Sequence, residues 1–237
     1  REWAVAPADP DGFAARAIEG MWREIGGKIT GSVNDGKVPV GLKPVFATKS
    51  PSLAEVVRDI NKYSNNVMTQ QLFLTMGLQA TGRGTWESGR QAMNQWWRSR
   101  WPQVPAPVWE NGAGLSRDER VTAQGLAAML QTAWASPQMP ELLSSLPIVG
   151  VDGTMRRVNT SSSKGMAHLK TGTLRDVTAL AGVVNSTSGK RYVLVGIINH
   201  PLAPGARPAL HALVDWVVQD TPPMSSTVAA AKAPPKR

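Results

Sequence analysis

The sequence predicts an α+β fold in which helices pack on an antiparallel sheet. Through the first half of the chain, apolar residues recur at the three- and four-residue spacing of amphipathic helices. Near the end, two apolar runs rich in β-branched residues, 179–184 and 192–198, flank a polar loop that contains glycine, which is typical of a β-hairpin. A closing helix begins at Pro208, so the order is helices, then hairpin, then helix.

Apolar stripes and end signals define the expected helices. These helices cover 13–25, 51–60, 68–77, 85–100, 122–134 and a segment from Pro208 onward. Ser50 is the expected N-cap of the second helix, and Leu53 is expected on its buried face. We expect Gly77 to end the third helix and Thr122 to cap the fifth.

The segments between the helices have turn and loop compositions. Residues 28–49 are short of helix formers and rich in Gly, Pro and Val, which favours strands and turns, and 101–108 is a proline-rich connection. Asn111–Gly114 forms a glycine-rich loop whose simplest interpretation is a packed turn. Residues 221–237, rich in Ala, Pro and Lys, are expected to be a disordered basic tail.

Composition limits the possible functions. Hydrophobic residues make up 42% and charged residues 18%, which suits a globular protein, and no run is long enough for a transmembrane helix. The chain has no cysteine, and its three histidines are scattered, so we expect neither a metal nor another cofactor. The net charge of +9 is dispersed and accompanies no nucleic-acid-reading motif, so we expect no nucleic-acid partner.

Three short motifs carry possible chemistry: Lys170-Thr171-Gly172, Ser64-Asn65-Asn66, and a Ser161-x-x-Lys164 match. Together, S-x-x-K, S-x-N and K-T-G form the signature of penicillin-recognising serine enzymes. In a K-T-G strand, the lysine provides a cation, the threonine hydroxyl can bind a carboxylate, and glycine permits close approach.

Each motif also has a purely structural interpretation. Lys170 can start a strand before a tight Thr-Gly, and Ser64 or Asn65 can cap the helix that follows. The Ser161-x-x-Lys164 match is expected to be fortuitous, because a working serine must sit at a helix start with the lysine one turn on. Here the surrounding residues have loop composition, and Lys164 is too near Lys170 for an intervening helix.

Longer stretches carry a more specific resemblance. Residues 50–72, 110–130 and 151–184 resemble, in order and separation, the D-Ala-D-Ala carboxypeptidases of class C penicillin-binding proteins, peptidase family S13. The resemblance implies a β-lactamase/transpeptidase-like catalytic domain with inserted domains. It implies that residues 1–49 end an inserted domain, that 50–220 form the C-terminal portion of the catalytic domain, and that the nucleophilic Ser-x-x-Lys lies upstream of this chain.

The resemblance also implies roles for individual residues. Ser64 would relay a proton to the leaving group, Asn66 would bind the substrate amide, and Lys170 would provide positive potential. Thr171, Gly172 and Thr173 would form the substrate-binding strand, with both threonine hydroxyls on the terminal carboxylate. The backbone N–H of Thr173 would be one oxyanion donor.

The implied reaction is hydrolysis of a peptidoglycan stem peptide ending in D-Ala-D-Ala, in the periplasm, through an acyl-enzyme that β-lactam antibiotics trap. Endopeptidase activity on cross-linked peptides and peripheral membrane contact stay open. The alternatives are a non-catalytic binding fragment of the same fold and, ranked below it, a β-lactamase or esterase. The loop at Asn111–Gly114 departs from the family's usual Asp-Gly-Ser-Gly, which leaves its role open.

Two geometric expectations follow. Lys170 Nζ should lie within about 8 Å of the Ser64 or Asn66 side chain, the reach of a bridging water. The strand that begins at Lys170 should pair with the strand at 192–198.

Overall fold

The structure is a computed structural model that describes residues 11–34, 36–44, 47–158 and 162–220. The chain divides into two compact units between Ser50 and Pro51. In the described part of the chain, no helix combines the length and apolar character needed to cross a membrane. The tail predicted at 221–237 lies outside the described residues.

The described part of the first unit contains one helix and no strand. Helix α1, Phe13–Glu24, matches the expected helix, but its apolar stripe is exposed, with Met21 67% and Trp22 47% accessible. The strands expected within 28–49 are absent from the described residues there, which form turns and irregular chain. A strand needs a neighbour for its N–H and C=O groups, and the apolar run Val38–Val40 has none here.

The second unit begins with α2, Leu53–Tyr63. Its N-cap is Ser52, not Ser50, because the Ser52 and Glu55 side chains satisfy each other's backbone N–H groups in a capping box. Leu53 is 64% exposed, so its expected burial was also wrong, whereas Ile60 on the same helix is buried. The cap sets the helix start, and Leu53 in the first turn lies outside the packed region.

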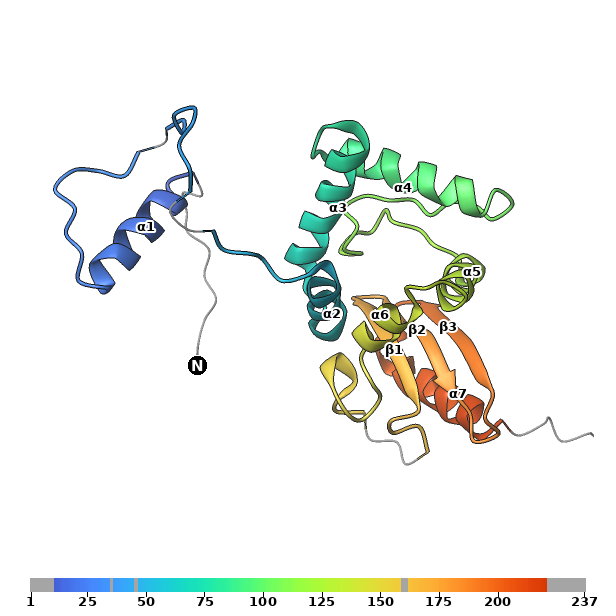
Figure 1. The fold of residues 1–237 in the computed structure, drawn as a ribbon. Helices are drawn as coiled ribbons and strands as arrows, with labels where there is room; N and C mark the ends of the chain where they lie inside the picture. Colours follow the sequence, from blue (N-terminus) through green and yellow to red (C-terminus); the bar gives the residue numbers. More distant parts are fainter. Residues whose placement is uncertain (1–10, 35, 45–46, 159–161, 221–237) are drawn as a thin grey trace, which may run out of the picture. The chain divides into compact units, whose positions relative to one another are not determined.

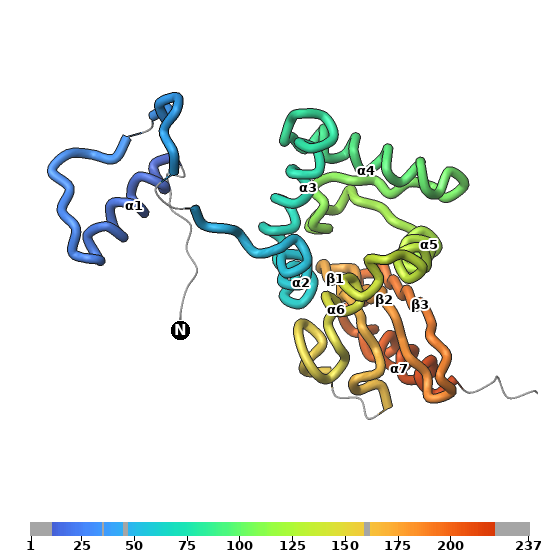
Figure 2. The backbone as a smooth tube through the Cα atoms, viewed as in Figure 1, coloured from blue at the N-terminus to red at the C-terminus, as the bar shows by residue number. Residues whose placement is uncertain are grey.

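Helices α3, Asn66–Thr81, and α4, Trp86–Arg100, pack against each other at an angle (Figure 2). Gly77 was expected to end α3, but the helix runs on to a left-handed cap at Gly82. Gly77 instead marks the crossing point, since a Cβ there would lie 2.6 Å from both Gly89 N and Ser88 Oγ. A glycine needed for close helix approach gives the same sequence signal as a C-cap glycine.

Helix α5, Ala123–Trp134, starts at the Thr122 cap as predicted. Three short elements were not predicted from the sequence: α6, Met139–Ser145, and the 3-10 turns η1, Gly153–Met155, and η2, Ala203–Ala206. All three are too short for a helical stripe to be read from the sequence.

Three antiparallel strands form the sheet, in the order β1, β2, β3: Ala167–Leu174, Val177–Asn185 and Arg191–Asn199 (Figure 1). The predicted hairpin is β2–β3. The expected pairing of the Lys170 strand with 192–198 was wrong, because β1 pairs with β2, with Lys170 opposite Ala181. Arg175 and Asp176 alone join β1 to β2, and such a two-residue turn pairs the strands it connects.

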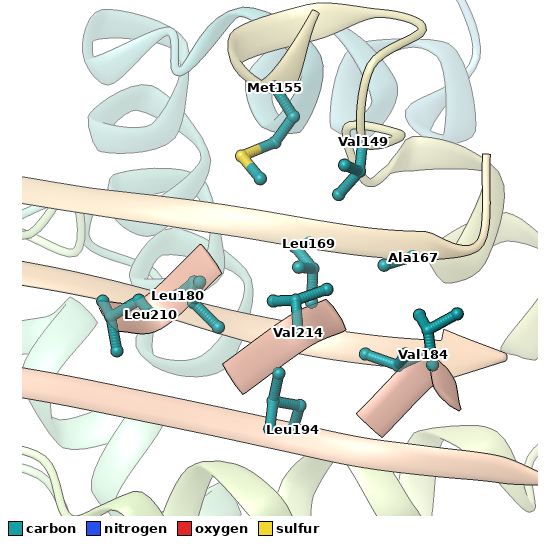
Figure 3. Packing of buried hydrophobic residues seen from close by; sticks show 10 residues of the cluster. Val149, Met155, Ala167, Leu169, Leu180, Val184, Leu194, Leu210 and Val214 are labelled. Carbon is teal, nitrogen blue, oxygen red and sulfur yellow. The ribbon is translucent and has the colours of Figure 1, made fainter. Parts of the chain in front are cut away.

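The closing helix α7, Arg207–Gln219, follows the 3-10 turn η2, Ala203–Ala206. The sheet and α7 share the main core. Leu210 and Val214 of α7 lie over the sheet beside Leu180 and Leu194, and Met155 of η1 closes the cluster beyond β1 (Figure 3). The sheet is therefore held rigidly on one side, which fixes the position of β1.

The α3–α4 crossing yields a stability test. Gly77→Ala gains about 1 kcal/mol of helix propensity, but overpacking against fixed backbone typically costs about 1–3 kcal/mol. Because the contact is with Gly89 backbone, which cannot rotate away, we expect net destabilisation in denaturant unfolding. Gly84→Ala is the matched control, since a Cβ there meets only ordinary contacts from 3.6 Å outward. Equal stability of the two variants would contradict the tight crossing.

Candidate active site

A cleft of about 990 Å³ lies in the second unit, between α2, α3, η1, β1, β2 and the start of α7. Its lining includes all six residues singled out from the sequence: Ser64, Asn66, Lys170, Thr171, Gly172 and Thr173. Segments distant in the sequence thus meet at one concave surface, the setting expected for a binding or catalytic site.

Ser64 has an unusual backbone conformation. It ends α2 with φ 55° and ψ 49°, one of only two described non-glycine residues with positive φ. The helix that follows is capped by Asn65, whose side-chain oxygen accepts from Met68 N at 3.1 Å. The capping interpretation therefore holds for Asn65, while the Ser64 side chain faces the cleft and Asn66 begins α3 beside it.

Lys170 joins β1 to the end of α2. Its Nζ donates to Ser64 Oγ at 3.0 Å and to the Thr171 carbonyl at 3.0 Å, well inside the expected limit. Burial lowers the pKa of Lys170, and no carboxylate of the described residues offsets this effect. A desolvated lysine beside a serine hydroxyl can share or transfer a proton more readily than a solvated one.

β1 is an edge strand, and its outer edge faces away from β2. Leu169 N donates across this edge to Pro147 O at 2.8 Å. Because N–H groups alternate sides along a strand, those of Thr171 and Thr173 point to the same outer edge. Among the described residues neither has a backbone acceptor there. These N–H groups are free to meet a ligand that lies along β1.

Gly172 leaves room beside the strand. A Cβ there would meet only Ala179 Cβ, at an ordinary 3.6 Å, so packing within the described residues does not require glycine at this position. A requirement for glycine would then have to come from what occupies the cleft.

Sequence reasoning missed Thr154 in η1. The Thr154 Oγ1 atom lies 3.1 Å from Thr171 Oγ1, and Thr154 lines the cleft. Gly153, with φ 55°, brings η1 so close to α2 that a Cβ would lie 2.6 Å from Lys62 O. The Asp-Gly turn inside the family-like stretch 151–157 was the available signal, but nothing in it indicated the contact with Thr171.

A second lysine fastens η1 to α2. Lys62, 8% exposed, donates to Leu146 O at 2.7 Å and pairs with Asp152 Oδ2 at 2.6 Å. Burial pushes the pKa of Asp152 upward, but the hydrogen bonds from Lys62 and from Ile148 N outweigh it and the pKa is lowered. The carboxylate therefore stays charged and holds the turn in place.

The glycine-rich loop is a packed turn that also lines the cleft. Glu119 Oε1 accepts from the backbone N–H groups of Glu110, Asn111 and Gly112 at 2.9–3.1 Å. Gly112 has φ 72°, and a Cβ on it would lie 2.6 Å from the Phe73 ring. The loop geometry thus accounts for Gly112, and the loop forms one wall of the site.

The described residues of the Ser161-x-x-Lys164 match, 162–164, do not line this cleft. Residues 162–166 form turns, Lys164 is exposed, and it is not among the residues that line the cleft. Ser161 itself lies outside the described residues. Among those residues, no three His, Asp or Glu side chains gather as possible metal ligands.

The fold of this chain is shared with proteins of known structure. The structure resembles that of penicillin binding protein 4 from Haemophilus influenzae in complex with a β-lactam, with a TM-score of 0.70 and 23% identity over 89% of this chain and 52% of that one. A predatory endopeptidase of Bdellovibrio bacteriovorus shares the fold with a TM-score of 0.59 and 16% identity, covering 90% and 59% of the two chains. The chain therefore shares the fold of these two proteins.

The chain belongs to the D-Ala-D-Ala carboxypeptidase 3 (S13) family, whose family model matches residues 1–219. It is 29% identical over 191 residues to the D-alanyl-D-alanine carboxypeptidase of Actinomadura sp. strain R39, covering 77% of this chain and 36% of that protein. It is 24% identical over 200 residues to the D-alanyl-D-alanine carboxypeptidase DacB of Haemophilus influenzae, covering 83% and 42%. The chain thus spans less than half the length of these relatives.

Lys62, which holds η1 to α2, and Lys170 in the cleft should respond differently to replacement by methionine. Lys62→Met leaves Asp152 without its cation and should cost about 1–3 kcal/mol of unfolding free energy, since Asp152 stays partly solvated. Lys170→Met removes a desolvated charge for which the described residues provide no carboxylate partner, so stability should be unchanged or higher. Denaturant unfolding measures the stability of both variants. An equal loss of unfolding free energy in the two would contradict the expected difference between Lys62 and Lys170.

The pH dependence of the Lys170 effect has a definite sign. Burial lowers the pKa of Lys170 in the folded state, whereas in the unfolded chain a lysine titrates at about 10.4. As the pH rises, the folded state therefore releases this proton first. Wild-type stability relative to Lys170→Met should therefore rise as pH climbs from the lowered pKa towards that value. Unfolding curves of the two proteins across this range test the sign, and a falling difference would refute it.

Proposed function

We propose that the protein containing this chain is a serine-type D-Ala-D-Ala carboxypeptidase that acts on peptidoglycan stem peptides through an acyl-enzyme in the periplasm. The observation that carries the proposal is the hydrogen bond from Lys170 Nζ to Ser64 Oγ at 3.0 Å inside the cleft. It unites an S-x-N element with a K-T-G strand, two of the three parts of the penicillin-recognising signature. The nucleophilic Ser-x-x-Lys would come from a segment outside residues 1–237.

The motif residues in the cleft have distinct roles in the proposed reaction. The nucleophilic serine attacks the carbonyl between the two D-alanines, and Ser64, bonded to Lys170, passes a proton to the departing D-alanine. The free outer-edge N–H of Thr173 supports its role as an oxyanion donor, a contribution of about 3 kcal/mol where measured elsewhere. Asn66 binds the amide side of the substrate, and Gly172 leaves space for it.

The charge of the cleft supports an anionic ligand end. Lys170, Arg157 and Arg207 line it, and within the described residues no Asp or Glu does. The terminal carboxylate of a D-Ala-D-Ala peptide, or the carboxylate of a penicillin, would meet positive potential and the hydroxyls of Thr171 and Thr173. The same features would suit an endopeptidase, whose substrate is a cross-linked peptide.

Labelling with a fluorescent penicillin tests the proposal. The full-length gene product should form a stoichiometric, saturable adduct and release D-alanine from a D-Ala-D-Ala peptide. Residues 1–237 alone should form none, because acylation needs an activated nucleophile in addition to the relay and the oxyanion donor. Mass spectrometry locates any adduct.

Each other outcome has a clear meaning. An adduct on Ser161 of the isolated chain would make the discounted motif the nucleophile, and an adduct on Ser64 would overturn its relay role. A full-length protein that is not acylated and releases no D-alanine would refute the enzyme and favour a non-catalytic binding protein of the same fold.

A further inference from the structure

We propose that Thr154 is a positioning residue for carboxylate recognition, acting by donating its hydroxyl hydrogen bond to Thr171 Oγ1 and so presenting the Thr171 proton to the substrate. This inference rests on the proposed function, because it concerns the carboxylate that Thr171 would bind. Its basis is the 3.1 Å separation between the two hydroxyl oxygens at the wall of the cleft.

The number of protons decides what Thr171 can do. Each threonine hydroxyl has one proton and can accept two hydrogen bonds, and the 3.1 Å pair uses one of the two protons. If Thr171 donates to Thr154, its proton is not available to a carboxylate, which only accepts. If Thr154 donates, the Thr171 proton is free and its donor strength is increased by the bond it accepts. A carboxylate in the cleft therefore selects the second arrangement.

The backbone around Thr154 is held firmly enough for such a role. Gly153 packs η1 against α2 so closely that a Cβ would lie 2.6 Å from Lys62 O and 3.1 Å from Pro147 Cβ. Asp152, one residue earlier, is anchored by Lys62 at 2.6 Å and by Ile148 N at 2.8 Å. The Thr154 hydroxyl is thus positioned from the α2 side, the same side that positions Ser64.

These contacts form a closed ring of side chains. Lys62 and Ser64 stand two residues apart at the end of α2, Lys170 and Thr171 are neighbours on β1, and Thr154 lies between Asp152 and Met155 in η1. The bonds Lys170–Ser64, Thr171–Thr154 and Lys62–Asp152 connect the three elements. Ser64, the proposed proton relay, and Thr171, the proposed carboxylate-binding residue, are therefore held in place by the same three elements.

The test compares two substrates of the full-length protein: a peptide ending in D-Ala-D-Ala and the same peptide with a C-terminal carboxamide. Thr154→Val removes the hydroxyl at nearly constant volume. It should raise KM for the carboxylate peptide about fivefold, the value of one hydrogen bond between neutral groups, with kcat little changed. The carboxamide peptide should be affected much less, so the ratio of the two kcat/KM values should fall.

Thr154→Ser keeps the hydroxyl and should restore the ratio. Thr75→Val is the matched control, because Thr75 is exposed on α3 and its hydroxyl bonds only the Gln71 carbonyl at 2.7 Å. It should leave both substrates unchanged. Thermal unfolding of each variant shows whether the protein folds, and if Thr154→Val does not, Thr154→Ala provides the same comparison.

An unchanged ratio, or an equal loss for both peptides, would overturn the positioning role. A wild-type protein that cleaves neither peptide and is not acylated refutes the proposed function instead. The Thr154 role is then measured by calorimetric binding of the two peptides, where the preference of the wild type for the carboxylate form must again fall in Thr154→Val. Equal preference in both proteins would refute it.

Discussion

The hydrogen bond between Lys170 and Ser64 is the contact on which the rest of the cleft depends. It joins the middle of β1 to the end of α2, two elements that otherwise belong to different layers of the second unit. Ser64 reaches the lysine only because its backbone leaves the helix in a left-handed conformation, φ 55°, which a β-carbon ordinarily disfavours. Such a conformation persists where the surroundings hold it in place, and it is common at functional sites.

Those surroundings are visible on both sides of Ser64. Asn65 caps α3 immediately afterwards, and two residues earlier Lys62 is bound to Leu146 O and Asp152. On the sheet side, β1 is paired to β2 along its whole length and packed against α7 through Leu169 and its neighbours. The flexible lysine side chain thus spans two fixed supports, which keeps its distance to Ser64 short although no carboxylate of the described residues offsets its desolvation.

Sequence reasoning predicted which motif residues lie together better than it predicted how the strands connect. Periodicity gave α4 and α5 and both strands of the β2–β3 hairpin, and the motifs gave six residues that share one cleft. It misplaced the partner of the Lys170 strand, because strand order depends on turn length as well as apolar pattern. It missed Thr154, since a side chain in a three-residue turn has no periodic signal, and it took Gly77 for a cap because packing glycines look the same.

Lys62 and Lys170 differ in how the surrounding residues compensate their charge. Lys62 is buried deeply but has Asp152 and a carbonyl as partners, so its charge is compensated and serves to fix the turn. Among the described residues Lys170 bonds a hydroxyl and a carbonyl but no carboxylate, so burial lowers its pKa and its charge is held at a cost. The described lining of the cleft contains no acidic group that could pair with Lys170. The positive charge of Lys170 is therefore available to an anionic ligand. Compensating it with a carboxylate would stabilise the fold and remove the attraction for an anionic ligand.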